Sequence, residues 1–561
     1  MKLRKILFRD YKSYKGTHVL TLDKGINTII GRNGAGKSHL FDVIRLPWHK
    51  LKSKDENSRI NQDPRIFMVY MTEEEKETIL NKCKALFNLD QHRHESTMDG
   101  LEFLAELLNL PVYLHGKPDY IISLGAIRIS EGSFLTESAP YNMLSGIDSL
   151  KDSSAFDQEY IKTLSNFYRS DEWDKFVQKN LKHGETDEDF VMRIYKRLEN
   201  NSFWLTNLLD LIRGINESIH FFQDVRTRPD LRITNTRNTY SGARTAEILL
   251  DLYTSEGLDE REKASRIIEQ FSRFFPEHDL LPVKGAKLMV IVRDAEKSDG
   301  GPLTLPIESM GMGFMELVIF FVNIFERKNQ IFLLEEPENH LHPNHQRMLA
   351  EVIRETSAQN QFVVISHSPH FIDIENICSN LIIKREEGSS SIVQVRESQF
   401  SRKEIGKIKK IFYHEHPENR EMFFARRVIL VEGGTEKMGL NYLAYELGNQ
   451  LSADDVFVAA IGGKGRFPIY HKLLTEFEID HEIVWDADVT SKIRKKIDNG
   501  LTIHEFQPDF EGPLKNKYPQ IYQEAEKKGQ GKPAKFISVV KSLIDKKGLK
   551  AIPTQYIDIV S

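Results

Sequence analysis

The stretch IIGRNGAGKSHL, residues 29–40, decides the fold of the first part of this 561-residue chain. GRNGAGKS fits the pattern G-x-x-x-x-G-K-[ST]. It follows the apolar run INTII (26–30) and precedes a helical pattern, which is the context that the motif requires. Glycines let backbone N–H groups face phosphate oxygens, and a helix N-terminus adds its dipole. We therefore expect an ATP-binding loop rather than a glycine-rich turn. The candidate residues are Asn33, Gly34, Gly36, Lys37 for the β- and γ-phosphates and Ser38 for Mg²⁺.

Two later motifs would complete an ATPase site. IFLLEEPENHLHP (331–343) is an apolar strand that ends in two acids. Glu335 is placed to hold Mg²⁺ and Glu336 to act as base toward the attacking water. FVVISHS (362–368) places His367 at the end of another strand, within reach of a γ-phosphate. The alternatives are that the acids merely favour the next helix N-terminus and that the histidine is structural.

A second set of acids follows two strands near the end of the chain. RRVILVEGGTEKMGL (426–440) carries Glu432 and Glu436, and HEIVWDADV (481–489) carries Asp486 and Asp488. At a frayed strand end both aspartates can turn toward one ion. With Glu432 they would make an oxygen-only site suited to Mg²⁺ or Mn²⁺. The alternative is that these acids cap the helices that follow.

Bulk composition sets wide limits. The length predicts about two to four domains. A net charge of −5 gives no global signal for nucleic acid, so any such surface must be local. Two cysteines, Cys83 and Cys378, exclude a disulfide framework and a cysteine-rich zinc site. The N-terminus has no signal-peptide pattern, and the longest apolar run (317–325) is too short to span a bilayer. We expect a cytoplasmic protein without a membrane partner.

The pattern of apolar residues divides the chain into five parts. Three- and four-residue apolar spacing is typical of helix from residue 72 onward and almost throughout 154–222. Strands are expected at 64–71, 287–294 and 303–307. The expected parts are an N-terminal ATPase lobe (1–72), a helical insertion (73–280), a C-terminal ATPase lobe (281–390), a polar connector (391–425) and a second α/β domain (426–561).

The three ATPase motifs, in this order around a long insertion, resemble the ABC-type ATPase heads of the SMC, RecF and Rad50 group. That resemblance implies that a signature loop from a second copy completes the γ-phosphate site. The consensus LSGGQ is absent, and ESMGMGF (308–314) occupies its place, with Ser309 and Gly311 as the expected contacts. The insertion shows no sustained heptads and would be a dimerisation lobe. Its five arginines are expected at the surface, with phosphate contact as the alternative: Arg226, Arg228, Arg232, Arg237 and Arg244.

The second acidic set, VILVEGGTEK with IVWDADV, resembles the TOPRIM fold. Behind an ABC-type head it is similar to the OLD (overcoming lysogenization defect) family, which includes nuclease subunits of Gabija-type phage defence. The resemblance implies a two-metal nuclease with ions about 4 Å apart. It implies that Glu436 and Glu511 help hold the second ion, with Asp509 nearby, and that Lys532 stabilises the scissile phosphate. The alternative for Lys532 is a solvated loop lysine. Lys464 and Arg466 either touch DNA or line a glycine-rich turn.

Three functions remain open at this point. The first is an ATP-regulated, metal-dependent endonuclease or nickase of double-stranded DNA, acting in anti-phage defence. It would be a dimer or tetramer joined through the ATPase heads and the insertion, with a companion such as a helicase or reverse transcriptase left open. The second is a repair-type ATPase whose TOPRIM domain is only structural. The third is a nucleotide-sensing subunit that acts on a partner. The expected fold is α/β: an ABC/SMC-like P-loop ATPase head with a helical insertion, followed by a C-terminal TOPRIM domain.

Overall fold

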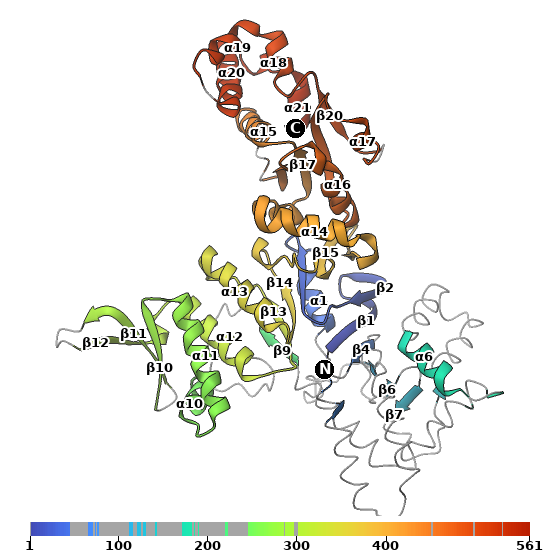
Figure 1. The fold of residues 1–561 in the computed structure, drawn as a ribbon, viewed down its shortest axis with the longest axis vertical. Helices are drawn as coiled ribbons and strands as arrows, with labels where there is room; N and C mark the ends of the chain where they lie inside the picture. The colour runs from blue at the N-terminus through green and yellow to red at the C-terminus, as the bar shows by residue number, and fades with distance from the viewer. Residues whose placement is uncertain are drawn as a thin grey trace, which may run out of the picture. The chain divides into compact units, whose positions relative to one another are not determined.

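The computed structural model (Figure 1) describes most of the chain outside the insertion. The described residues are 2–44, 245–284, 287–296, 301–449, 451, 453–497, 500–529 and 531–560, with short stretches between 66 and 222. The five insertion arginines lie outside them. The chain divides into two compact units. One is Met1–Ile29, Asn33–Phe371 and Arg385–Ile392; the other is Ile30–Arg32, Ile372–Lys384 and Val393–Ser561.

An antiparallel sheet begins the first unit. Its strand order is β2-β1-β4-β5-β6-β7-β8. The bounds are β1 Lys2–Tyr11, β2 Tyr14–Thr21, β4 Ile66–Tyr70, β5 Val112–His115, β6 Ile121–Leu124, β7 Ile127–Ser130 and β8 Tyr141–Asn142. β1 and β2 pair over most of their length, and β1 buries Leu3, Ile6 and Leu7. The strand expected at 64–71 is therefore confirmed as β4.

Four of these strands correct the prediction for the insertion. β5 to β8 all lie within 73–280, which we predicted to be helical, and that prediction was wrong for these residues. Each has at most four residues, too few to separate strand from helix by periodicity. Helix α6 (Asp171–Asn180) agrees with the prediction for 154–222, whereas β9 (Ile219–Phe222) does not. The β9 sequence IHFF pairs with a central strand, and this non-local partner overrides the local pattern.

A second sheet carries the ATPase motifs. Its order is β16-β15-β3-β14-β13-β9. The bounds are β3 Ile26–Gly31, β13 Ile331–Glu335, β14 Gln361–Ile365, β15 Asn380–Glu386 and β16 Ser389–Gln394. β3, β14, β13 and β9 are parallel. Their near-continuous apolar sequences suit strands that are covered on both faces. Parallel strands end at one edge, so the segments after β3, β13 and β14 converge there.

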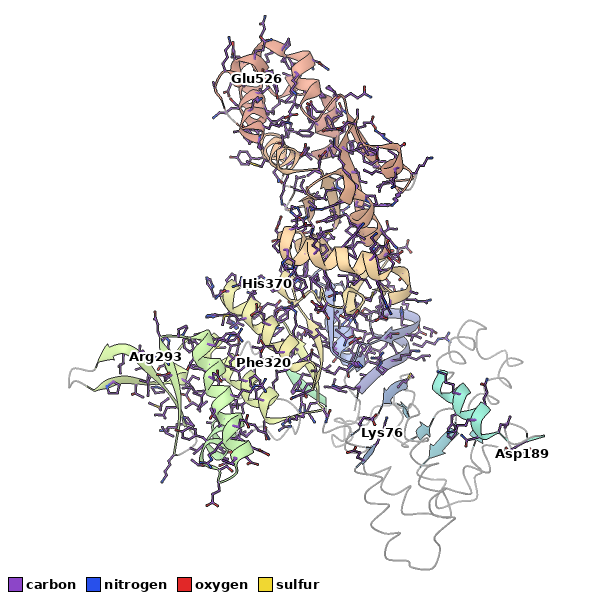
Figure 2. The ribbon with its side chains drawn as sticks, in the orientation of Figure 1. Lys76, Asp189, Arg293, Phe320, His370 and Glu526 are labelled. Atoms are coloured by element: carbon purple, nitrogen blue, oxygen red, sulfur yellow. The ribbon has the colours of Figure 1, made fainter. Side chains whose placement is uncertain are left out.

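Helices and a small antiparallel sheet complete the first unit. The helices are α1 Lys37–Ile44, α10 Thr245–Thr254, α11 Leu258–Phe274, α12 Met312–Glu326 and α13 Pro343–Thr356. The sheet is β10-β11-β12, with bounds His278–Val283, Lys287–Glu296 and Pro302–Pro306. Figure 2 labels Phe320 on α12. Phe320 and Phe321 of this helix lie in the same buried core as Phe271 of α11. None of the helices in the described ranges is long and apolar enough to cross a membrane.

The second unit is built on a parallel sheet with the order β18-β17-β19-β20. The bounds are β17 Arg427–Val431, β18 Val456–Ala460, β19 Asp480–Asp486 and β20 Ile503–Phe506. Along β17, Val428 and Leu430 belong to one apolar core, and Ile429 and Val431 to another. This alternation shows that both faces of the sheet are covered.

Helices form the cover of this second sheet. They are α15 Gly434–Glu446, α16 Phe467–Glu476, α17 Ser491–Arg494, α18 Gly512–Lys517, α19 Pro519–Glu526, α20 Lys532–Lys547 and α21 Thr554–Val560. Buried residues of α16, such as Tyr470, belong to the core that contains Val428. Buried residues of α15 and α20, such as Val540, belong to the other core, and α19 lies between α18 and α20 in Figure 1, in contact with both.

The segment that we expected to be a polar connector, 391–425, is folded. It contains the end of β16, helix α14 (Arg402–Lys410), a π-helical turn (Ile411–Glu415) and a 3-10 segment (Pro417–Phe424). Phe412 and Phe423 are buried in the core around Tyr470. Its high charge suggested a linker, but a few large apolar side chains are sufficient to bury one face.

Candidate functional site

The glycine-rich loop after β3 is shaped by contacts that come from distant parts of the chain. Gly34 and Gly36 have φ values of 75° and 107°, which favour glycine. A Cβ on Gly36 would collide with the Ser390 hydroxyl and lie 2.7 Å from that of Ser13. The Tyr14 hydroxyl also donates to the Gly36 carbonyl at 3.1 Å. The backbone at Gly36 is therefore packed against Ser13, Tyr14 and Ser390, three residues that sequence reasoning did not identify.

The residues expected around the triphosphate come together. The Ser38 hydroxyl donates to Glu335 Oε1 at 2.6 Å, so the two groups predicted to hold Mg²⁺ are adjacent. Lys37 is buried, and this burial lowers its pKa, although the carboxylates of Glu336 and Glu335 oppose the shift. Asn33 is exposed at the front of the loop. The arrangement offers a cation and a hydroxyl beside two carboxylates.

Glu336 and His367 also meet. Glu336 has φ 48°, unusual for a residue with a side chain, and its N–H donates to Ile365 at 2.8 Å. One carboxylate oxygen accepts from the Asn339 amide at 3.0 Å, and the other lies 3.7 Å from His367 Nε2. Burial and then the charge of Lys37 lower the pKa of His367, against the effect of Glu336. Burial and Lys37 thus favour the neutral imidazole beside the expected base.

Glu338 is a site residue that sequence reasoning missed. It is 7% exposed, and Oε1 accepts from the Ser366 hydroxyl at 2.7 Å, from His367 N at 2.6 Å and from Ser368 N at 3.2 Å. Burial raises its pKa. Glu338 thereby joins the segment after β13 to the segment after β14 and holds the backbone of His367. The only signal was a third acid in EEPEN, which is equally typical of a helix start.

Ser309 and Gly311 lie just before and at the start of α12. The Ser309 hydroxyl donates to the Pro306 carbonyl at 2.6 Å, and Gly311 precedes the first helical residue. Both residues are exposed. Their predicted contact with nucleotide on a second copy requires this exposure.

The second unit brings its acids to one edge of its sheet. β17 and β19 are parallel neighbours, with Val431 opposite Val484. Glu432 follows the end of β17 and Asp486 ends β19, so both side chains belong to the carboxyl edge. Glu436 Oε2 accepts from Gly433 N at 3.0 Å and caps α15. The capping alternative therefore holds for Glu436, while its carboxylate still lies close to the other acids.

Electrostatics shows how closely these carboxylates are grouped. Burial raises the pKa of Asp486 to about 6, with a further contribution from Glu436 and smaller ones from Glu432 and Asp488. Burial also raises the pKa of Glu436, and the charges of Glu432 and Glu511 add to the shift. Asp486 and Glu436 are harder to ionise because they are buried and because their neighbours carry the same charge. Such clustering of raised pKa values is typical of functional sites.

Lys464 offsets part of this negative charge. Lys464 Nζ is 3.5 Å from Glu432 Oε2 and forms a close ion pair with Asp488. The sequence suggested DNA contact or a place in a glycine-rich turn for Lys464; the structure shows its side chain against the acids, and DNA contact stays a prediction. Arg466 instead donates to the Ile461 carbonyl at 2.8 Å and lies against the glycine turn.

Glu511 and Lys532 have different surroundings. Glu511 is 4% exposed, and Lys515 lies 3.9 Å from its carboxylate and 2.9 Å from that of Asp509. Lys532 begins α20 with an exposed side chain. Within the described ranges no ion pair or hydrogen bond joins Lys532 to the acids. The structure thus brings Glu511 toward Glu436 and leaves Lys532 at the surface.

The chemistry of the acidic set fits a hard divalent cation. All its donors are carboxylate oxygens, which Mg²⁺ and Mn²⁺ prefer. Glu432 Oε2 is buried and has no hydrogen-bond partner. Among the described residues, no three histidine, cysteine or acidic side chains are already grouped tightly enough to hold an ion. The set therefore suits a cation chemically, and its carboxylates would have to draw closer to bind one.

Known families match both parts of the chain. The family described as AAA ATPase domain matches residues 1–372. The family described as overcoming lysogenization defect protein-like, TOPRIM domain, matches residues 423–488. These matches confirm the two resemblances drawn from the motifs. They also confirm the predicted fold class, a P-loop ATPase followed by a TOPRIM α/β domain.

Individual relatives match more locally. The OLD nuclease of Thermus scotoductus is 28% identical over 201 residues, which cover 33% of this chain and 37% of that protein. Endonuclease GajA of Bacillus cereus strain VD045 is 30% identical over 175 residues, 31% of this chain and 28% of that protein. The matches thus span less than two fifths of these relatives. The solved SMC head domain from Thermotoga maritima has 12% identity, covers 71% of this chain and 100% of that one, and has a TM-score of 0.31.

Proposed function

The chain belongs to the AAA ATPase domain family, and on this premise we propose that it is an ATP-regulated, divalent-metal-dependent DNA endonuclease. The OLD-like TOPRIM domain is the part that would cut. The observation that carries the proposal is the grouping of Glu432, Glu436 and Asp486 at the carboxyl edge of its sheet. The repulsion between these carboxylates would be relieved by a cation bound among them.

In the ATPase part, Lys37 would neutralise the β- and γ-phosphates in the loop after β3. Ser38 and Glu335 would hold the Mg²⁺ that accompanies the nucleotide, which supplies charge neutralisation during phosphoryl transfer. Glu336 would orient the attacking water, and His367 would contact the γ-phosphate. These two roles are supported by the short distance between the side chains, 3.7 Å from His367 Nε2 to Glu336 Oε1.

In the TOPRIM part, Glu432, Asp486 and Asp488 would hold one Mg²⁺ or Mn²⁺, and Glu436 and Glu511 would help hold a second. Bound metal supplies an activated water and stabilises the leaving oxygen of a phosphodiester. Lys532 would bring its ammonium to the scissile phosphate. Because its side chain is exposed at the start of α20, it would reach that phosphate only when DNA lies against this helix.

The proposal also covers partners. The substrate would be double-stranded DNA, since the relatives are named as nucleases. Exposed Ser309 and Gly311 would complete the nucleotide site of a second copy, so the ATPase heads and the insertion would join a dimer or tetramer. A role in anti-phage defence, with a companion protein such as a helicase or reverse transcriptase, rests on the resemblance to Gabija-type subunits.

A second candidate is a nucleotide-sensing or repair-type ATPase whose TOPRIM domain needs a partner or is only structural. Two observations favour it. Lys532 lies outside the acidic set, and no ready metal-binding group exists among the described residues. The two candidates differ in whether the purified chain cuts DNA by itself.

Supercoiled plasmid provides the test, with Mg²⁺ or Mn²⁺ and with or without ATP. We expect the wild-type chain to nick or linearise the plasmid and Glu432→Ala to be inactive. The matched control is Glu421→Ala, an exposed glutamate in the same unit, which should cut normally. Lys37→Ala shows whether ATP activates or restrains cutting. Cleavage by Glu432→Ala would contradict the proposal. If nothing cuts while ATP is hydrolysed, the second candidate is favoured.

A further inference from the structure

We propose that Lys464 is a built-in counter-ion of the acidic set that a divalent cation must displace. Its ammonium pairs with Glu432 and Asp488, the same carboxylates that would bind the metal. Metal binding and the Lys464 ion pairs are then mutually exclusive. This inference rests on the proposed function in one respect, that Glu432 and Asp488 are metal ligands.

The first support is the loop that carries Lys464. The N–H groups of Gly462 and Gly463 donate to the Glu432 carbonyl at 2.9 Å and 3.0 Å, which ties the loop to the end of β17. The two glycines have φ values of 73° and 124°. A Cβ on Gly462 would collide with Arg466 and His416. The positive φ values would strain a residue with a side chain at either position.

The second support is the opposite orientation of the two cations in this turn. Arg466 is tied to the Ile461 carbonyl and lies 2.8 Å from Glu415 Oε2. Lys464 stands at the other end of the same 3-10 turn and reaches the acids. Arg466 thus anchors the turn, while Lys464 is presented to Glu432 and Asp488. A solvated loop lysine would need no such anchoring.

The third support is the balance of charge. Lys464 contributes one positive charge near Glu432, Asp486 and Asp488, and its presence lowers the pKa of Asp486 against the effect of the neighbouring acids. Lys515, another lysine described near the set, lies 2.9 Å from the carboxylate of Asp509 and 3.9 Å from that of Glu511. A divalent cation would be attracted by the same oxygens and repelled by the ammonium.

The fourth support is that the ammonium can leave. The Asp488 side chain is 70% exposed and that of Lys464 is 23% exposed, so their ion pair borders solvent. Lysine has a long flexible stem that can turn away without backbone movement. Displacement therefore requires no unfolding of the turn that Arg466 anchors.

The test is Mn²⁺ binding to the full chain without nucleotide or DNA. Electron paramagnetic resonance measures the concentration of free Mn²⁺ during the titration. Lys464→Met should bind Mn²⁺ about two- to fivefold more tightly, the range that a partly exposed ion pair supports. Lys464→Arg, which keeps the charge, should bind as wild type does. Lys492→Met, at an exposed lysine of the same unit, is the control and should not change affinity. Unchanged or weaker binding by Lys464→Met overturns the proposal.

A second measurement uses the wild-type chain, in case Lys464→Met does not fold. The lysines are reductively ¹³C-methylated, and the Lys464 signal is assigned by its absence in Lys464→Arg. Titration with Mg²⁺ should move this signal to the position of solvent-exposed lysines, and a signal that does not move contradicts displacement.

Glu432→Ala separates the two proposals. If it binds Mn²⁺ as tightly as wild type, the proposed metal site fails. If it binds weakly while Lys464→Met is not tighter, only the counter-ion inference fails.

Discussion

Two sets of carboxylates stand at the ends of parallel strands in this chain, and their surroundings differ. After β13, Glu335 accepts from Ser38, Glu336 from Asn339, and Glu338 from three donors. After β17 and β19, Glu432 and Asp488 pair with Lys464, while burial and the neighbouring acids raise the pKa values of Glu436 and Asp486. The first set is held mainly by hydrogen bonds, whereas the second combines like charges with the ion pairs of Lys464.

This difference indicates that the two sets of carboxylates are arranged in different ways before a ligand binds. Hydrogen-bonded acids keep one geometry before the ligand arrives, as preorganised catalysis requires. Mutually repelling acids instead store unfavourable energy that a bound cation relieves. The ATPase set is therefore expected to resist changes of ionic conditions, while the TOPRIM set should respond strongly to metal and pH.

The largest expected effect is that of Lys37→Ala, which should change ATP hydrolysis and leave metal binding at the second set unchanged. Lys37→Ala should lower ATP hydrolysis by about 10²-fold or more, because a positioned cation beside the phosphates is lost. Mn²⁺ affinity at the TOPRIM set, measured without nucleotide, should stay unchanged. Lys24→Ala, at an exposed lysine of the same unit, is the control. A loss of Mn²⁺ affinity in Lys37→Ala would show that the two sets are not independent.

Glu338→Ala tests whether the first set depends on its hydrogen bonds. Three donors lose their acceptor in a buried place, so the free energy of unfolding should fall by about 1–3 kcal/mol. ATP hydrolysis should fall as well, since the backbone of His367 loses its support. Denaturant unfolding and a steady-state ATPase assay measure the two effects. Glu262→Ala, at an exposed glutamate of α11, should change neither; equal behaviour of the two variants would refute a positioning role.

Gly462→Ala tests the turn that presents Lys464 to the second set. Its positive φ and the collision with Arg466 and His416 should cost about 1–3 kcal/mol of stability. Gly465→Ala is a control within the same turn, because a Cβ there meets nothing within 4 Å. Thermal unfolding of both variants measures the difference. Similar stabilities would mean that the turn can relax and does not hold Lys464 in place.

The smallest expected effect is a pH dependence of the second set. The pKa of Asp486 is raised from 3.8 to about 6 in the folded chain, so folding favours its protonated form. Its contribution is fully present below about pH 3.8 and is lost as the pH rises through about 6. Without metal, wild type should therefore lose stability over this window relative to Asp486→Asn. Urea unfolding with a chelator measures the difference, and parallel pH profiles would contradict it.

Local patterns were sufficient for much of the fold. The strand, loop and helix around residues 26–44 follow from an apolar run, glycines and a helical pattern that lie next to one another in sequence. The strands β13, β14, β17 and β19 were recognisable as apolar runs that end in polar residues. The short strands β5 to β8 were not, because each has too few residues to show a strand period. The folded connector was not, because core neighbours such as Tyr470 are distant in sequence.

The sequence by itself determined which chemical groups the two sites contain. Strand ends supply Lys37, Ser38, Glu335, Glu336 and His367 in one unit and Glu432, Asp486 and Asp488 in the other. The tertiary structure alone decided what each group faces: Ser390 against Gly36, Glu338 beneath His367, and Lys464 between Glu432 and Asp488. The physical reason is that strand ends are set by local patterns, whereas hydrogen bonds and charge pairs depend on which distant segments the fold brings together.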